Sequence, residues 1–77
     1  MEQQIKQEGI DIGGNIRKLR LEKGIGQTQL VCLLQLEGAS MTREALVKIE
    51  RGAQHIQASQ LRAIRDALGV SYDDLLK

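Results

Sequence analysis

The chain has 77 residues, of which 42% are hydrophobic, and this length and composition suit one domain with one core. It contains no Phe, Trp or Pro and a single Tyr, so Leu, Ile and Val favour packed helices over a β-sandwich. The net charge of +1 excludes a protein that coats nucleic acid through bulk positive charge. Any nucleic-acid contact must instead use a local cluster of cations, together with neutral donors such as the nine glutamines.

Cysteine and histidine each occur once, as Cys32 and His55, so neither an intramolecular disulfide nor a metal site is expected. We expect Cys32 to be a small buried residue on the inner side of a helix, with a redox-sensing thiol as the weaker alternative. No nucleophile–base pair or phosphate-binding glycine motif is present, which predicts a protein without enzymatic activity or cofactor. The first residues do not resemble a signal peptide and no apolar run is long enough for a membrane span, which predicts a cytoplasmic protein without membrane contact.

The N-terminal residues 1–10 are polar and rich in glutamine, without a sustained period. They are predicted to form a flexible tail, although an arm that contacts DNA or a partner remains an alternative. The folded domain is expected over residues 11–77. Its first helix is predicted from Ile12 to Lys23, with Asp11 as the N-cap and Gly24 as the C-terminal stop.

The second helix is predicted from Gln27 to Leu36, after Gly26 as the N-cap, with leucines at positions 30, 33 and 34 facing the core. The third is predicted over about 42–51, with Thr42 as its N-cap and Gly52 at its end. Met41 and Leu46 flank that cap at the spacing of a hydrophobic staple.

The fourth helix is predicted from Ser59 to Leu68, and a short fifth helix follows Ser71. Ser71 and Asp74 have the spacing of a capping box, with Asp in place of the usual Glu or Gln. Tyr72 and Leu76 are candidates for an exposed apolar surface between two copies of the chain. The expected fold class is all-α, a compact bundle of five helices.

The third helix has two different faces when successive residues are placed ~100° apart. Ala45, Leu46 and Ile49 then form an inward stripe. The opposite stripe combines cations, one acid and one β-branched residue, namely Arg43, Glu44, Val47, Lys48 and Arg51. Such a mixture suits a helix in the major groove of DNA, but an ordinary solvated face has the same appearance.

The order of motifs resembles the XRE family, the lambda-repressor-like and Cro-like helix-turn-helix domains. The resemblance covers Ile12–Leu76 and rests on short stretches spread along the chain. These are Ile16-Arg17-Lys18-Leu19-Arg20, Lys23-Gly24-Ile25, Gln27 with Leu30, Lys48-Ile49-Glu50-Arg51-Gly52 and Ala67-Leu68-Gly69-Val70-Ser71. It implies that the second and third predicted helices read double-stranded DNA.

The family pattern implies a role for individual residues of this chain. Base reading is implied for Arg43, Glu44 and Lys48, with Val47 on the same surface. Contacts with DNA phosphates are assigned to Gln27, Thr28, Thr42, Arg51, Gln54 and His55. A structural ion pair is implied between Arg20 and Glu50.

The chain departs from the family pattern between its second and third helices, which are about five residues further apart than in the tight motif. Those residues either extend the second helix or enlarge the turn. The loop after Gly52 also lacks the basic residues common in the family. The resulting hypothesis is a transcriptional regulator of the prophage-repressor or antitoxin type, a homodimer when bound to DNA and with room for an unidentified protein partner. The alternative is a protein-interaction module with the same fold.

Overall fold

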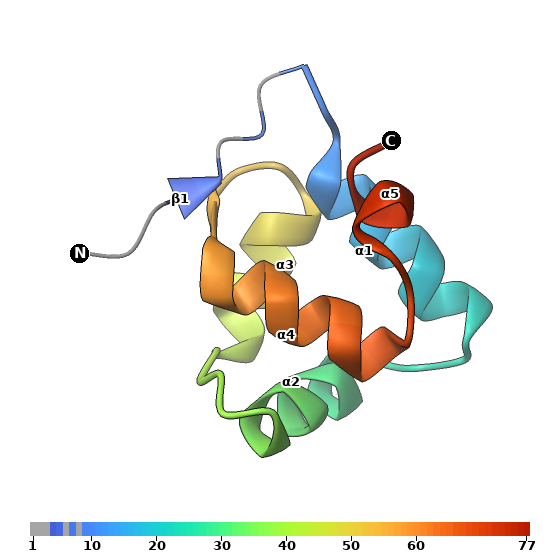
Figure 1. Ribbon diagram of the computed structural model, residues 1–77. Coiled ribbons are helices and arrows are strands. Elements are labelled where there is room, and N and C mark those ends of the chain that lie inside the picture. Colours follow the sequence, from blue (N-terminus) through green and yellow to red (C-terminus); the bar gives the residue numbers. More distant parts are fainter. Residues whose placement is uncertain (1–3, 6, 8) are drawn as a thin grey trace.

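The computed structural model describes residues 4, 5, 7 and 9–77, and within them the chain is helical apart from one small sheet (Figure 1). The helices in this part of the chain are α1 (Ile12–Glu22), α2 (Gln27–Leu36), α3 (Arg43–Glu50), α4 (Ala58–Leu68) and α5 (Tyr72–Leu75). The strands are β1 (Gln4–Ile5) and β2 (Ile56–Gln57). The predicted all-α class is confirmed, and α2 has the predicted bounds.

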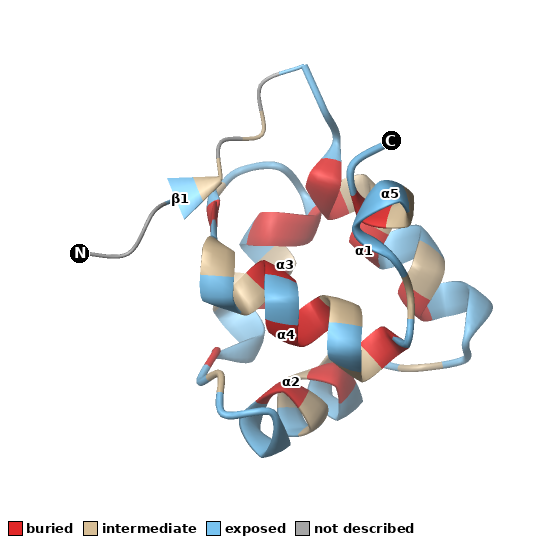
Figure 2. Ribbon diagram, viewed as in Figure 1, coloured by how far each residue is buried: buried red, intermediate tan, exposed pale blue. Residues whose placement is uncertain are grey.

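The helices surround one core, and the buried positions of α1, α3 and α4 face one another (Figure 2). Helix α1 packs on α3 and α5, and α2 packs on α3 and α4. The core consists of Ile12, Ile16, Leu30, Leu34, Met41, Leu46, Ile49, Ile56, Leu61, Ala63, Ile64, Leu68 and Leu75. Most of these core side chains are branched aliphatic ones and none is aromatic, as the composition indicated.

The helix caps predicted from the sequence are present. The Asp11 carboxylate accepts a hydrogen bond from the Gly14 amide at 2.9 Å, and the Thr42 hydroxyl accepts one from the Ala45 amide at 3.0 Å. Ser71 and Asp74 form the predicted capping box. Helix α4 begins one residue earlier than predicted, because the Gln57 amide donates to the Gln60 side chain at 3.0 Å and this supports an additional residue of helix.

The predicted tail contains a short strand that the sequence did not predict. β1 pairs with β2 in antiparallel register, with Gln4 opposite Gln57 and Ile5 opposite Ile56. Two paired residues are too few to produce a recognisable alternation of apolar and polar positions. The prediction of a flexible tail at residues 1–3, 6 and 8 lies outside the described residues.

The longer connection between α2 and α3 enlarges the turn and leaves α2 unextended. Helix α2 ends at Leu36, and Gly38 adopts the left-handed conformation with φ of 84°. The Ala39 amide donates to the Leu34 carbonyl at 2.9 Å, which closes the end of the helix. Met41 is then buried, so the connection is anchored to the core immediately before α3 begins.

Helices α1 and α3 approach each other backbone to backbone at Gly13. A β-carbon at this position would clash with the carbonyl oxygen of Ile49 and contact the backbone of Glu50. The sequence predicts a helix here, but only the packing against α3 explains why its first turn contains glycine at this position. The close approach fixes the distance between α1 and the end of α3.

Candidate nucleic-acid interface

A buried ion pair joins α1 to the end of α3. The Arg20 Nε donates to Glu50 Oε2 at 2.8 Å, and the Arg20 Nη2 donates to Glu50 Oε1 at 2.8 Å. The two side chains are only 7% and 2% exposed. The hydrogen bonds with Glu50 raise the pKa of Arg20, so its charge is retained despite burial. The pair that the family pattern implied is therefore formed with bidentate geometry.

The start of α2 is bound to this pair. The Gln27 Nε2 donates to Glu50 Oε1 at 3.1 Å, and the Arg20 Nη1 donates to the Ile25 carbonyl at 2.9 Å. The N-cap of α2 is Gly26, which has no side chain to accept hydrogen bonds from the first amides of the helix. The first amides of this helix consequently have no partner within it and are able to donate to an anion. Because Gln27 is bonded to Glu50, the first amides of α2 lie beside the C-terminal end of α3.

The outer face of α3 has the residues that its periodicity predicted. Arg43, Glu44 and Lys48 are exposed and Val47 is half-buried. On the inner side, Leu46 and Ile49 are completely buried, and Ala45 is half-buried. The exposed face therefore offers two long cationic donors, one acceptor and one apolar contact.

The loop between α3 and β2 is held by Gln7, a residue for which the sequence predicts no role. The Gln7 Nε2 donates to the carbonyls of Ile49 and Gln54, at 3.1 and 2.9 Å. Its Oε1 accepts from the Gly13 amide at 2.8 Å, and its amide donates to His55 Nδ1 at 3.3 Å. Three of these four partners are backbone groups, and three lie more than 40 residues away in the sequence, so no local pattern identifies Gln7.

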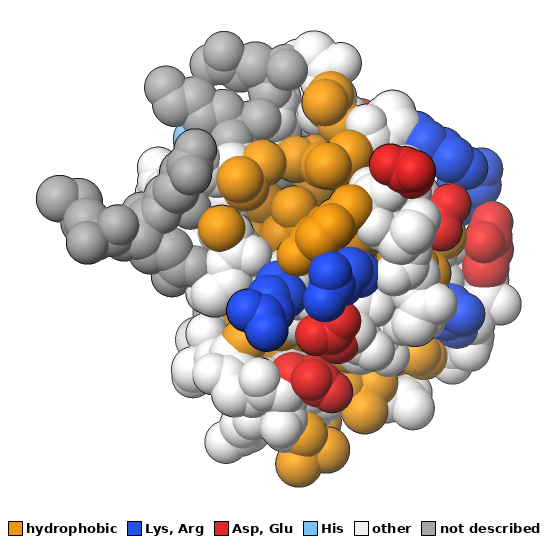
Figure 3. All heavy atoms as spheres, viewed as in Figure 1, with side chains coloured by type: hydrophobic (Ala, Val, Ile, Leu, Met, Phe, Trp, Pro, Cys, Tyr) orange, Lys and Arg blue, Asp and Glu red, His pale blue; other side chains and the backbone are white. Residues whose placement is uncertain are grey.

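A group of hydrophobic side chains lies on the face between α4 and α5 (Figure 3). Tyr72 and Leu76, in α5 and at its C-terminal end, are 37% and 36% exposed. The guanidinium of Arg65 lies 4.5 Å from the centre of the Tyr72 ring, in the range of a cation–π contact. Both candidates for an exposed apolar surface are therefore accessible in the single chain.

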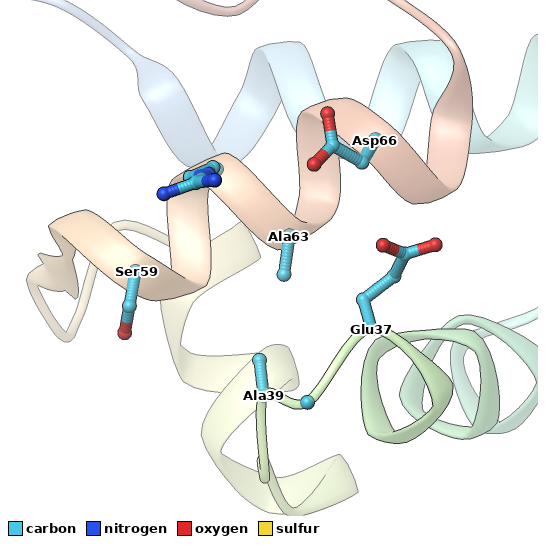
Figure 4. Close-up of a pocket in the computed structure, with 7 residues that line it drawn as sticks. Glu37, Ala39, Ser59, Ala63 and Asp66 are labelled. Atoms are coloured by element: carbon cyan, nitrogen blue, oxygen red, sulfur yellow. The ribbon is translucent and has the colours of Figure 1, made fainter.

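A groove of about 350 Å³ lies between the end of α2 and α4. Asp66 and Ala63 lie on the α4 side of this groove, and Glu37 and Ala39 lie on the side formed by the chain that follows α2 (Figure 4). None of the residues predicted to contact DNA line this groove. The groove is lined by one cation, Arg62, as well as by these two carboxylates, and it is therefore not counted as part of the candidate interface.

The prediction that Cys32 is buried is wrong, because its side chain is exposed. Leu30 and Leu34 lie one helical turn apart on the buried face of α2, and Cys32, two residues from each, is placed on the opposite face. Among the described residues, no three His, Cys, Asp or Glu side chains are grouped closely enough to hold a metal ion. In the same part of the chain, no helix is both long and apolar enough to cross a membrane.

Helices α2 and α3 are joined by a turn and held to α1 through Glu50, and they form a helix-turn-helix unit within a fold of five helices in the described part of the chain. The restriction-modification controller protein C.AhdI from Aeromonas hydrophila has this fold, with a TM-score of 0.75, 24% identity, and coverage of 87% of this chain and 94% of that chain. Two structures of the clp gene regulator ClgR from Corynebacterium glutamicum have TM-scores of 0.73 and 0.72 at 26% identity. Each covers 84% of this chain, and the matched regions are 64% and 78% of those chains.

No protein-family model matches the chain, and no curated protein sequence matches it. The predicted resemblance to lambda-repressor-like helix-turn-helix domains is confirmed by the structural comparisons.

Proposed function

We propose that the protein is a transcriptional regulator that binds double-stranded DNA with α3 in the major groove. The observation that carries this proposal is the exposed face of α3 on a helix-turn-helix unit, since a helix of this unit enters the groove. Two structural neighbours are named as a controller and a gene regulator, which supports the same class of function. The protein acts in the cytoplasm, without catalysis, and residues 11–77 form the DNA-binding domain.

The side chains on α3 are suited to different base edges. Arg43 and Lys48 donate to guanine, Glu44 accepts from cytosine, and Val47 contacts a thymine methyl group. The exposure of the three charged residues and the half-burial of Val47 fit this assignment. The net charge of only +1 makes specific contacts of this kind more important than general attraction to DNA.

Phosphate contacts are assigned to residues around both ends of α3. The Thr42 hydroxyl accepts a bond from its own helix, and its proton remains available for a phosphate oxygen. Beyond the other end, Arg51 and His55 are exposed. Gln27 and Thr28 begin α2, whose free amides add donors at the same site. Gln54, in the loop, is the remaining phosphate contact.

We assign the homodimer interface to the apolar face between α4 and α5 (Figure 3). Tyr72 and Leu76 contribute exposed apolar surface there. A twofold dimer presents two copies of α3 to DNA, so its operator is expected to be palindromic.

Selection of bound sites from a random duplex library tests the proposed function. We expect a palindromic motif whose half-sites are about one helical turn, or a multiple of it, apart. A motif without symmetry would contradict the dimer, and the absence of any enriched motif would contradict sequence-specific binding.

Arg43→Ala and Lys48→Ala are each expected to weaken binding to the selected site about 5- to 100-fold, because each removes a donor to a base edge. The measurement is a titration of labelled duplex, and unfolding curves establish that both variants remain folded. Arg62→Ala and Lys18→Ala are matched controls, since both side chains are exposed but lie outside the candidate interface. Binding by all four variants at the wild-type affinity would show that α3 is not the reading helix.

A further inference from the structure

Gln7 connects three parts of the domain that are separate in the sequence. Its Oε1 accepts from the Gly13 amide in the first turn of α1, where amides have no partner within the helix. Its Nε2 donates both to the Ile49 carbonyl in the last turn of α3 and to the Gln54 carbonyl in the following loop. The side-chain amide therefore uses both of its protons and its oxygen for bonds to the backbone.

The backbone of Gln7 adds a contact with the same loop. Its amide donates to His55 Nδ1 at 3.3 Å, so this nitrogen is an acceptor. In a neutral imidazole the proton is then on Nε2, which leaves that nitrogen as a donor for another group. Ile5 pairs with Ile56, the residue that follows His55, and this pairing also holds the N-terminal arm next to the loop.

The loop held in this way contains two of the residues to which we assign phosphate contacts, Gln54 and His55. Neither carries a long cationic side chain, so each must reach a phosphate through a short-range hydrogen bond. Hydrogen bonds of this kind require donors within about 3 Å of the acceptor and are sensitive to the position of the backbone. A mobile loop would lose entropy on binding DNA, whereas a loop fixed beforehand would not.

We propose that Gln7 is a positioning residue for DNA binding, which fixes the loop after α3 so that Gln54 and His55 meet the phosphates. This inference rests on the proposed function and extends it to the N-terminal arm. Gln7 acts through the loop, without touching DNA. This role predicts that a substitution of Gln7 lowers the affinity for DNA only when the side chains of Gln54 and His55 are present.

Gln7→Glu is the sharpest variant, because it keeps the size of the side chain and replaces its two N–H donors by carboxylate oxygen beside two carbonyls. Gln4→Glu is the matched control: it adds the same charge to the same arm at an exposed residue. Both are compared with wild type and in a second background that combines Gln54→Ala with His55→Ala. Affinity is measured on the selected duplex, and unfolding curves confirm that each variant is folded.

We expect Gln7→Glu to weaken binding about tenfold in the wild-type background and less than twofold in the background without the loop side chains. Gln4→Glu should change affinity less than twofold in both. Equal losses from Gln7→Glu in the two backgrounds, or no loss in either, would overturn the positioning role.

Amide hydrogen exchange without DNA separates this inference from the proposed function. We expect the amides of residues 52–56 to exchange about tenfold faster in Gln7→Glu than in Gln4→Glu, whereas the amides of α4 keep their wild-type rates. Unchanged exchange in the loop would show that Gln7 does not hold it. If the wild-type protein binds no duplex, the proposed function is overturned, and with it the role of Gln7 in DNA binding. Faster exchange in Gln7→Glu would then show only that Gln7 holds the loop.

Discussion

Glu50→Ala is expected to lower the free energy of unfolding by about 3–5 kcal/mol, because it leaves the Arg20 guanidinium buried without its carboxylate. The side chains of Arg20 and Glu50 are only 7% and 2% exposed, so water cannot replace the lost partner without rearrangement. Gln27 also loses its acceptor at Glu50 Oε1, which loosens the start of α2. A domain of this length has a total free energy of unfolding of only about 4–12 kcal/mol. The loss is a large fraction of this total, so the variant is expected to be partly unfolded at physiological temperature. Urea denaturation followed by circular dichroism measures the change.

Glu44→Ala is the matched control for this prediction, since Glu44 is an exposed glutamate on the same helix. Its expected cost is below about 1 kcal/mol, from the loss of a favourable charge in the first turn of α3. Replacing both partners, with Arg20→Met and Glu50→Leu in one chain, should recover most of the stability lost in Glu50→Ala. Equal destabilisation by Glu50→Ala and Glu44→Ala would show that the ion pair has no special role in the fold.

Gly13→Ala is expected to destabilise the domain by about 3 kcal/mol, although alanine normally stabilises a helix relative to glycine by about 1 kcal/mol. The added methyl group would clash with the backbone of Ile49 and Glu50, which cannot move aside as a flexible side chain does. The change also pushes α1 away from α3, so the pair between Arg20 and Glu50 is expected to weaken. The measurement is again urea denaturation.

Gly26→Ala is the control, because the added methyl group meets no atom within 4 Å and Gly26 does not adopt a left-handed conformation. Its cost as a change of N-cap residue should stay below about 1 kcal/mol. A stable Gly13→Ala protein would mean that α1 and α3 do not meet backbone to backbone as described.

Most of the fold was predictable because the signals for its helices are local. Asp11, Thr42 and Ser71 cap helices in the structure as their positions in the sequence predicted. The period of the apolar residues identified the buried side of α3 and of α4. The exposed face of α3, which carries the candidate site, followed from the same period.

Contacts between segments that are distant in the sequence were decided only by the tertiary structure. The role of Gln7 depends on backbone groups of α1, α3 and a loop, and such groups have no residue-specific signal. The buried face of α2 was predicted correctly at Leu30 and Leu34, but most residues of this helix are apolar, so the pattern did not exclude Cys32 from the core. Likewise, the need for glycine at position 13 arises only when α3 lies against α1. The sequence by itself thus determined the helices and most of their caps, whereas tertiary packing determined how the N-terminal arm holds the loop after α3 and how closely α1 approaches α3.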